Sequence, residues 1–145
     1  MSTQQSAHSR QRTATPTRIR FQTPRVSFKA LLDDSAIATT ITNKLPITST
    51  VRRWGDEIYF DVPVRLPNAR PTLEVRIGDI AYWPDGPCLC IFFGKTPASR
   101  AQEPQPASEV TIIGHTEAPV SLLRSIKAET SITLDHASPA EDQTV

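Results

Sequence analysis

Apolar and polar residues alternate in several short segments of the chain. The clearest is 57–64, where Ile58, Phe60, Val62 and Val64 are separated by Glu57, Tyr59, Asp61 and Pro63. A period of two is typical of a β-strand with one buried face. Further apolar segments that we interpret as strands are 19–21, 26–30, 47–53, 73–77, 80–83, 88–93, 110–113 and 131–134. Thirteen prolines and five glycines separate these pieces, as expected of strands joined by turns.

Two other segments have helical spacing. In 36–44 the apolar residues recur every four positions, and Asp33, Asp34 and Ser35 just before them offer capping oxygens. Residues 120–126 predict a second, shorter helix. About eight short strands with one or two helices predict a mainly β domain. A closed antiparallel barrel is favoured, because closure leaves no exposed strand edge.

Length and charge limit the remaining possibilities. A chain of 145 residues has room for one domain, which we place at 18–135, with polar tails at 1–17 and 136–145 that we expect to be disordered. The net charge of +1 argues against a dedicated nucleic-acid-binding protein. No window approaches the roughly 18 apolar residues of a membrane span, and no signal-peptide core is visible. We therefore expect a cytoplasmic protein without a membrane or nucleic-acid partner.

Metal and cofactor sites also lack their usual residues. Cys88 and Cys90 stand two apart in an apolar run, so on a strand they share one face, and we expect both to be buried reduced thiols. A zinc site needs about four ligands, and the only histidines are His8, His115 and His136. We interpret His115, at a strand end, as a surface residue. The glycines are scattered singly, so no phosphate-binding loop is present, and we expect neither a metal nor a cofactor.

Three motifs occur in a fixed order: W-G-D-E-I-Y-F at 54–60, G-D-I-A-Y-W at 78–83 and I-F-F-G at 91–94. On these motifs the chain resembles the cyclophilin-like family of small stand-alone barrels, found in bacteria and fungi and largely uncharacterised. The resemblance extends from about Ile19 to Leu134. It implies a closed eight-stranded cyclophilin-like barrel with a helix capping one end.

The same resemblance argues against prolyl isomerase chemistry. True cyclophilins use an arginine in an F-H-R segment together with a glutamine near an F-F pair. This chain has no F-H-R segment, and Cys90-Ile91, not a glutamine, precedes Phe92-Phe93. Arg52, Arg53 and Arg76 match no position of that motif. We therefore predict that prolyl isomerase activity is absent or weak.

The resemblance places a ligand groove on the outer face of the sheet, which is the side of Glu57, Tyr59 and Asp61. Our candidate ligand-binding residues are Trp54, Glu57, Tyr59, Tyr82, Trp83 and Phe92. Glu57 is the candidate catalytic residue, because a carboxyl group beside aromatic rings in a cleft can have a raised pKa and carry a proton. The alternative interpretation is a solvated strand face and aromatic residues that only pack the barrel.

Two functions remain open at this point, with a third behind them. The first is a binding module for a small apolar ligand or a peptide in an aromatic-lined groove. The second is a cofactor-free enzyme, such as an isomerase, cyclase or dehydratase, that uses Glu57 as acid and base. Weak prolyl isomerase activity is the third. The sequence indicates neither the ligand nor the oligomeric state.

Overall fold

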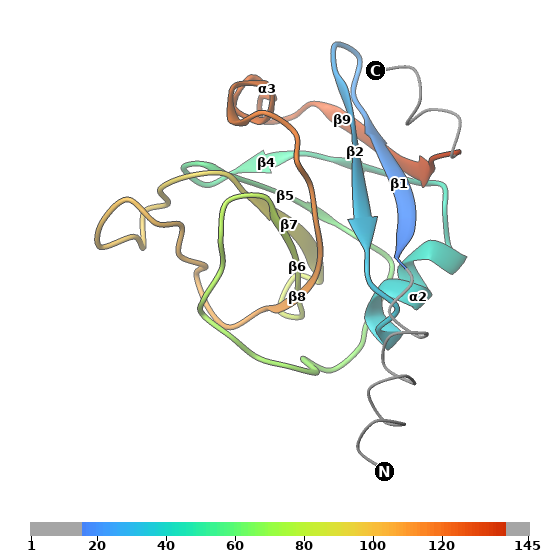
Figure 1. The fold of residues 1–145 in the computed structure, drawn as a ribbon, viewed down its shortest axis with the longest axis horizontal. Coiled ribbons are helices and arrows are strands. Elements are labelled where there is room, and N and C mark those ends of the chain that lie inside the picture. Colours follow the sequence, from blue (N-terminus) through green and yellow to red (C-terminus); the bar gives the residue numbers. More distant parts are fainter. Residues whose placement is uncertain (1–15, 139–145) are drawn as a thin grey trace, which may run out of the picture.

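The computed structural model describes residues 16–138, which form nine strands and two helices (Figure 1). In chain order the elements are β1 (Thr17–Gln22), β2 (Ser27–Leu32), α2 (Ala36–Asn43), β3 (Ile47–Thr50), β4 (Arg52–Arg53), β5 (Glu57–Asp61), β6 (Asp79–Trp83), β7 (Cys88–Phe92), β8 (Thr111–His115), α3 (Val120–Arg124) and β9 (Ser131–His136). The predicted tails fall outside the described residues except at their inner ends, where Thr17 begins β1 and His136 ends β9.

The strands form one antiparallel sheet in the order β3-β9-β1-β2-β8-β6-β7-β5-β4. Its two edge strands, β3 and β4, are consecutive in the chain and are separated only by Val51. The amide of Val51 donates to the carbonyl of Thr130 at 2.8 Å. The bend therefore occurs where β3 stops pairing with β9. β3 pairs with β9 and β4 pairs with β5, and this one stretch therefore spans the seam of a nearly closed barrel. The expected strand 47–53 is present but bent, which gives nine strands instead of eight.

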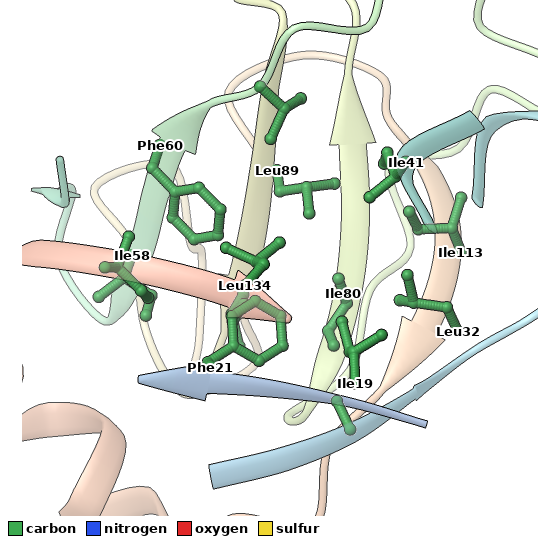
Figure 2. Packing of buried hydrophobic residues seen from close by; sticks show 14 of the residues in the cluster. Ile19, Phe21, Leu32, Ile41, Ile58, Phe60, Ile80, Leu89, Ile113 and Leu134 are labelled. Carbon is green, nitrogen blue, oxygen red and sulfur yellow. The ribbon is translucent and has the colours of Figure 1, made fainter. Parts of the chain in front are cut away.

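The barrel interior is filled by the apolar residues that the alternation pattern predicted (Figure 2). The ring of Phe21 stacks on Phe28 with 4.8 Å between centroids and meets the ring of Phe60 at 6.2 Å with a tilt of 65°. Ile58 and Phe60 of β5 point into this core. Each large side chain buried here stabilises the fold by roughly 1.5–3 kcal/mol, so the core fixes which face of every strand points outward.

Both predicted helices are present, and they lie on opposite sides of the barrel in Figure 1. The hydroxyl of Ser35 accepts a hydrogen bond from the amide of Ala38 at 3.3 Å, which satisfies one free N–H at the start of α2. Ile37 and Ile41 of α2 are buried against the core. Leu123 anchors α3 in the same way.

The prediction of a strand at 73–77 is wrong. Leu73 and Ile77 have 45% and 50% of their surface exposed, and only Val75 of the apolar positions is buried. This part of the chain pairs with the sheet through one isolated β-bridge, between Thr72 and Val110. Residues 73–77 form no ladder with any strand of the sheet.

Candidate functional site

Strands β5, β7 and β6 lie side by side, and their outer face carries the candidate residues. Glu57 is paired with Phe92, and Tyr59 is paired with Cys90, which is also the partner of Ala81 on β6. Paired residues in a sheet point to the same side. Because Ile58 and Ile91 belong to the barrel core, the side chains of Glu57, Tyr59, Cys90 and Phe92 all face outward. The predicted separation of Glu57 and Tyr59 from the apolar stripe is confirmed.

The long connection between β7 and β8 covers part of this outer face. The indole Nε1 of Trp83 donates to the hydroxyl of Ser108 at 2.7 Å. Within the connection, the hydroxyl of Thr96 donates to the carbonyl of Gln105 at 2.6 Å. Pro106 is buried although it belongs to no strand or helix. These contacts hold the connection, which we call the covering loop (residues 94–110), against the sheet.

Trp54 is positioned by the turn that precedes β5. Gly55 has a φ of +62°, a value that glycine adopts without steric cost. The amide of Asp56 donates to the carbonyl of Lys95 at 2.8 Å, and the amide of Phe93 donates to the carbonyl of Asp56 at 2.9 Å. The turn is thereby joined to the beginning of the covering loop, and Trp54 stands at the edge of the outer face.

The sheet face, the turn and the covering loop form a cavity of about 170 Å³ that opens to solvent. Its lining comprises Trp54, Glu57, Tyr59, Trp83, Cys90, Phe92, Pro106, Ala107 and Val110. Five of the six candidate residues from the sequence are therefore brought together at one site. Cys90 and the three residues of the covering loop were not among the candidates. The period of two placed Cys90 on the face of Cys88 and could have identified it, whereas nothing in the loop sequence indicates which residues fold back.

Tyr82 is the exception, and the expectation that it lines the groove is wrong. Its side chain has 0% exposure and lies in the barrel core. The Tyr82 hydroxyl donates to the carbonyl of Val64 at 2.7 Å and accepts from the amide of Leu66 at 3.1 Å. Neighbouring residues on a strand point to opposite faces. Because Trp83 points outward into the cavity, Tyr82 must point inward.

Glu57 supplies the carboxyl group of the cavity. Only 5% of its surface is exposed. Burial raises its pKa to about 7, because the charged form loses hydration, and a hydrogen bond from the Cys90 thiol partly offsets this rise. Near neutral pH the group therefore exists in both forms. It can donate a hydrogen bond as a carboxylic acid or hold a negative charge as a carboxylate.

A polar cluster adjoins the cavity at Tyr59. The guanidinium of Arg52 lies over the Tyr59 ring, 5.0 Å from its centroid, and donates to Asp61 at 2.5 Å. The thiol of Cys88 also donates to Asp61, with 3.3 Å between sulfur and oxygen. Hydrogen bonds from Arg52 and then Cys88 lower the pKa of Asp61. Burial, followed by the Asp61 contact, raises the pKa of Cys88 to about 11, so this thiol is not a nucleophile near neutral pH.

The other candidate groups lie away from the cavity. His115 at the end of β8 is exposed and meets Asp79 at 3.4 Å and Glu117 at 3.0 Å, as a surface histidine does. Both cysteines are free and buried, as expected. Within residues 16–138, no three His, Cys, Asp or Glu side chains are grouped as metal ligands. Neither helix in this part of the chain is long and apolar enough to cross a membrane.

Comparisons with known proteins agree with this architecture. The sequence matches the family model described as Cyclophilin-like over residues 17–135. The structure is similar to the solution structure of the hypothetical protein AF2241 from Archaeoglobus fulgidus, with a TM-score of 0.72 and 33% sequence identity. This similarity covers 86% of the chain and 97% of the archaeal protein. No curated protein matches the sequence.

Proposed function

Because the chain belongs to the cyclophilin-like family, we propose that the outer face of its barrel binds a small, largely apolar ligand in the cavity between the sheet and the covering loop. One observation supports this above all: a single buried carboxyl group lies in a cavity whose other walls are mostly apolar and aromatic. Ligand sites in proteins commonly combine apolar walls with a few polar groups that set the orientation.

The size of the cavity limits the part of the ligand that enters it. A volume of about 170 Å³ is close to that of the engineered apolar cavities of roughly 150 Å³ that bind benzene. One six-membered ring fills this space. The ligand is therefore a compact molecule, or one that inserts a single ring, and Glu57 makes its polar contact.

Absence of prolyl isomerase activity is part of the proposal. No arginine among the described residues lines the cavity. Arg52 is bound to Asp61. Arg53 donates to the main-chain carbonyls of Arg124 and Ile126 at 3.1 and 2.9 Å. Both guanidinium groups are already hydrogen-bonded within the protein. This is a second argument against isomerase activity, beside the missing F-H-R segment and glutamine.

The second candidate function is proton transfer by Glu57 to or from a bound substrate. The pKa of about 7 favours it, because a group with this pKa both accepts and donates protons near neutral pH. Glu57→Gln removes the proton-carrying group and keeps its shape. Loss of turnover with retained binding would assign catalysis to Glu57, and unchanged turnover would exclude this mechanism.

We also propose a reducing, cytoplasmic location for the protein. Two cysteines that are free and buried support it, because reducing compartments keep thiols unpaired. Fractionation of cells that express the native protein tests this location. Recovery in a secreted or membrane fraction would contradict it.

Binding can be measured through the protein's own fluorescence. The chain has two tryptophans, Trp54 and Trp83, and both line the cavity. Titration with cyclohexanone, cyclohexanol or benzyl alcohol is expected to change the emission saturably and to raise the melting temperature. A saturable response to a short proline-containing peptide alone would contradict the small-ligand proposal. No saturable response to any probe would contradict binding at this cavity altogether.

Two variants of the covering loop provide the control. Ala107 lines the cavity, so Ala107→Phe is expected to fill it and to abolish the response. Ala101 is an exposed residue of the same loop and does not line the cavity. Ala101→Phe makes the same chemical change and is expected to leave the titration unaltered.

A further inference from the structure

Aromatic rings make up much of the cavity wall. Trp54, Tyr59, Trp83 and Phe92 all contribute to its walls. The rings of Tyr59 and Trp83 are nearly perpendicular, at 89°, with centroids 6.4 Å apart, so they form a corner of two walls. The face of an aromatic ring carries partial negative charge and attracts a cation within about 6 Å of its centroid.

Glu57 lies among these rings without a cationic partner. Among residues 16–138, the only side chain that affects the pKa of Glu57 through a hydrogen bond is that of Cys90, a neutral thiol on β7. No lysine, arginine or histidine of the described residues lines the cavity. Buried carboxylates in proteins are normally paired with a cation or bound to a metal. When Glu57 is ionised, its negative charge therefore has no cation beside it among the described residues that line the cavity.

The charges around the cavity do not oppose a second cation there. Arg52 lies over Tyr59, and its charge is balanced by Asp61 at 2.5 Å. The thiol of Cys90 stays protonated, because burial and then the nearby Glu57 raise its pKa well above the ordinary value. Glu57 is thus the single group of the lining that changes charge near neutral pH.

We infer that the ligand of this cavity carries an organic ammonium group, which pairs with the Glu57 carboxylate while its alkyl substituents pack on Trp54, Tyr59 and Trp83. A trimethylated or otherwise alkylated amine fits best, because it is weakly hydrated and its bulk suits a cavity of about 170 Å³. This inference rests on the proposed function and names the chemical class of the ligand.

The pH dependence separates this ligand from a neutral one. An ammonium group binds the ionised form of Glu57, so its affinity rises with pH. A neutral hydrogen-bond acceptor binds the protonated form, so its affinity falls. With a pKa of about 7, the ionised fraction rises roughly tenfold between pH 6 and pH 8, and the apparent affinity for the cation rises by the same factor.

Choline and 3,3-dimethylbutan-1-ol form a matched pair of probes, because they have the same shape and differ in one positive charge. At pH 8 we expect choline to bind at least about tenfold more tightly than 3,3-dimethylbutan-1-ol, as followed by tryptophan fluorescence and calorimetry. Equal or tighter binding of the neutral alcohol would overturn the inference. If the ring compounds bind but choline does not, the inference fails and the proposed function stands. If none of these probes binds, both fail.

A third probe tests the source of the ammonium group. A short peptide containing trimethyl-lysine presents the same group on a protein side chain. We expect choline to bind at least as tightly as this peptide, in agreement with a free small molecule. Clearly tighter binding of the peptide would overturn the small-molecule assignment.

Two carboxyl variants complete the test. Glu57→Gln is expected to reduce the affinity for choline to that for the neutral alcohol and to remove the pH dependence. Binding of the alcohol by this variant shows that the cavity is still folded. Glu103→Gln alters an exposed carboxyl group of the covering loop that does not line the cavity. Unchanged choline binding by Glu57→Gln would overturn the inference, as would loss of choline binding by Glu103→Gln.

Discussion

The indole Nε1 of Trp83 and the hydroxyl of Ser108 are joined by a hydrogen bond of 2.7 Å. This bond connects the last residue of β6 to the covering loop, which supplies Pro106, Ala107 and Val110 to the cavity. One wall of the site is thus attached to the end of β6 through a side-chain hydrogen bond.

Ser108→Ala is expected to loosen the covering loop without unfolding the barrel. Loss of one partly buried hydrogen bond costs about 1 kcal/mol. Hydrogen exchange at the amide of Val110, which donates to the carbonyl of Thr72 at 3.0 Å, should accelerate, while the amides of β5 and β7 remain protected. Ser27→Ala, on an exposed position of β2, is the control and should change neither. Equal protection of the loop in both variants would contradict the anchoring role of the Trp83–Ser108 bond.

Glu57 should make the stability of the protein depend on pH. Its pKa is about 7 in the folded chain and about 4.5 when unfolded, so between these values the folded state holds more protons. The stabilisation that comes from protonated Glu57 in the folded state is complete below pH 4.5 and is lost as the pH rises through 7. The difference amounts to about 3 kcal/mol in the free energy of unfolding.

Urea denaturation of wild type and Glu57→Gln between pH 5 and pH 8 measures this contribution. In Glu57→Gln the free energy of unfolding is expected not to fall as the pH rises, because the amide side chain that replaces the carboxyl group cannot titrate. Glu103→Gln serves as the control for removal of an exposed carboxyl group, and its stability should still decrease as the pH rises. Parallel pH profiles for wild type and Glu57→Gln would exclude a raised pKa at this residue.

Tyr82 should matter for stability and not for binding. Tyr82→Phe removes a hydroxyl that bonds to the carbonyl of Val64 and the amide of Leu66, both of which then lack this partner. The expected loss is about 1–3 kcal/mol in urea denaturation. Tyr59→Phe, on the cavity wall, is the comparison and should cost less. Altered probe titrations in Tyr82→Phe, with Tyr59→Phe unchanged, would reverse this assignment.

The two cysteines should resist modification in the folded protein. Both are buried, and burial raises the pKa of Cys88 to about 11 and that of Cys90 well above its ordinary value. Reaction with a thiol-specific chromogenic reagent at pH 8 should therefore be slow and limited by local opening of the groups that cover the outer face of β7. In denaturant both thiols should react at once. Fast reaction of either thiol without denaturant would contradict the burial of this sheet face.

Most of the fold could be predicted from the sequence because alternation and turn residues are local signals. The strict period of two in 57–62 placed Ile58 and Phe60 inside the barrel and Glu57 outside. The same reasoning failed for 73–77, since a period of two does not reveal whether a segment pairs with a neighbouring strand. The bend at Val51 was also missed, because it results from pairing with two different strands.

The placement of the candidate residues on one face could be predicted in part for the same reason. Trp54, Glu57, Tyr59, Trp83 and Phe92 converge as the motifs implied. Tyr82 was included with Trp83 although neighbours on one strand cannot share a face. The contribution of the covering loop depends on long-range contacts, such as the one between Trp83 and Ser108, which no local pattern encodes.

The protonation of Glu57 is the most direct test of the account. Carbon-13 NMR of the glutamate carboxyl groups, assigned with Glu57→Gln, gives its titration midpoint in the free protein and in the presence of choline. We expect a midpoint of about 7 in the free protein and a clearly lower midpoint with choline bound. A midpoint near 4.5 in the free protein, with no change on addition of choline, would contradict both the buried carboxyl group and its role in binding.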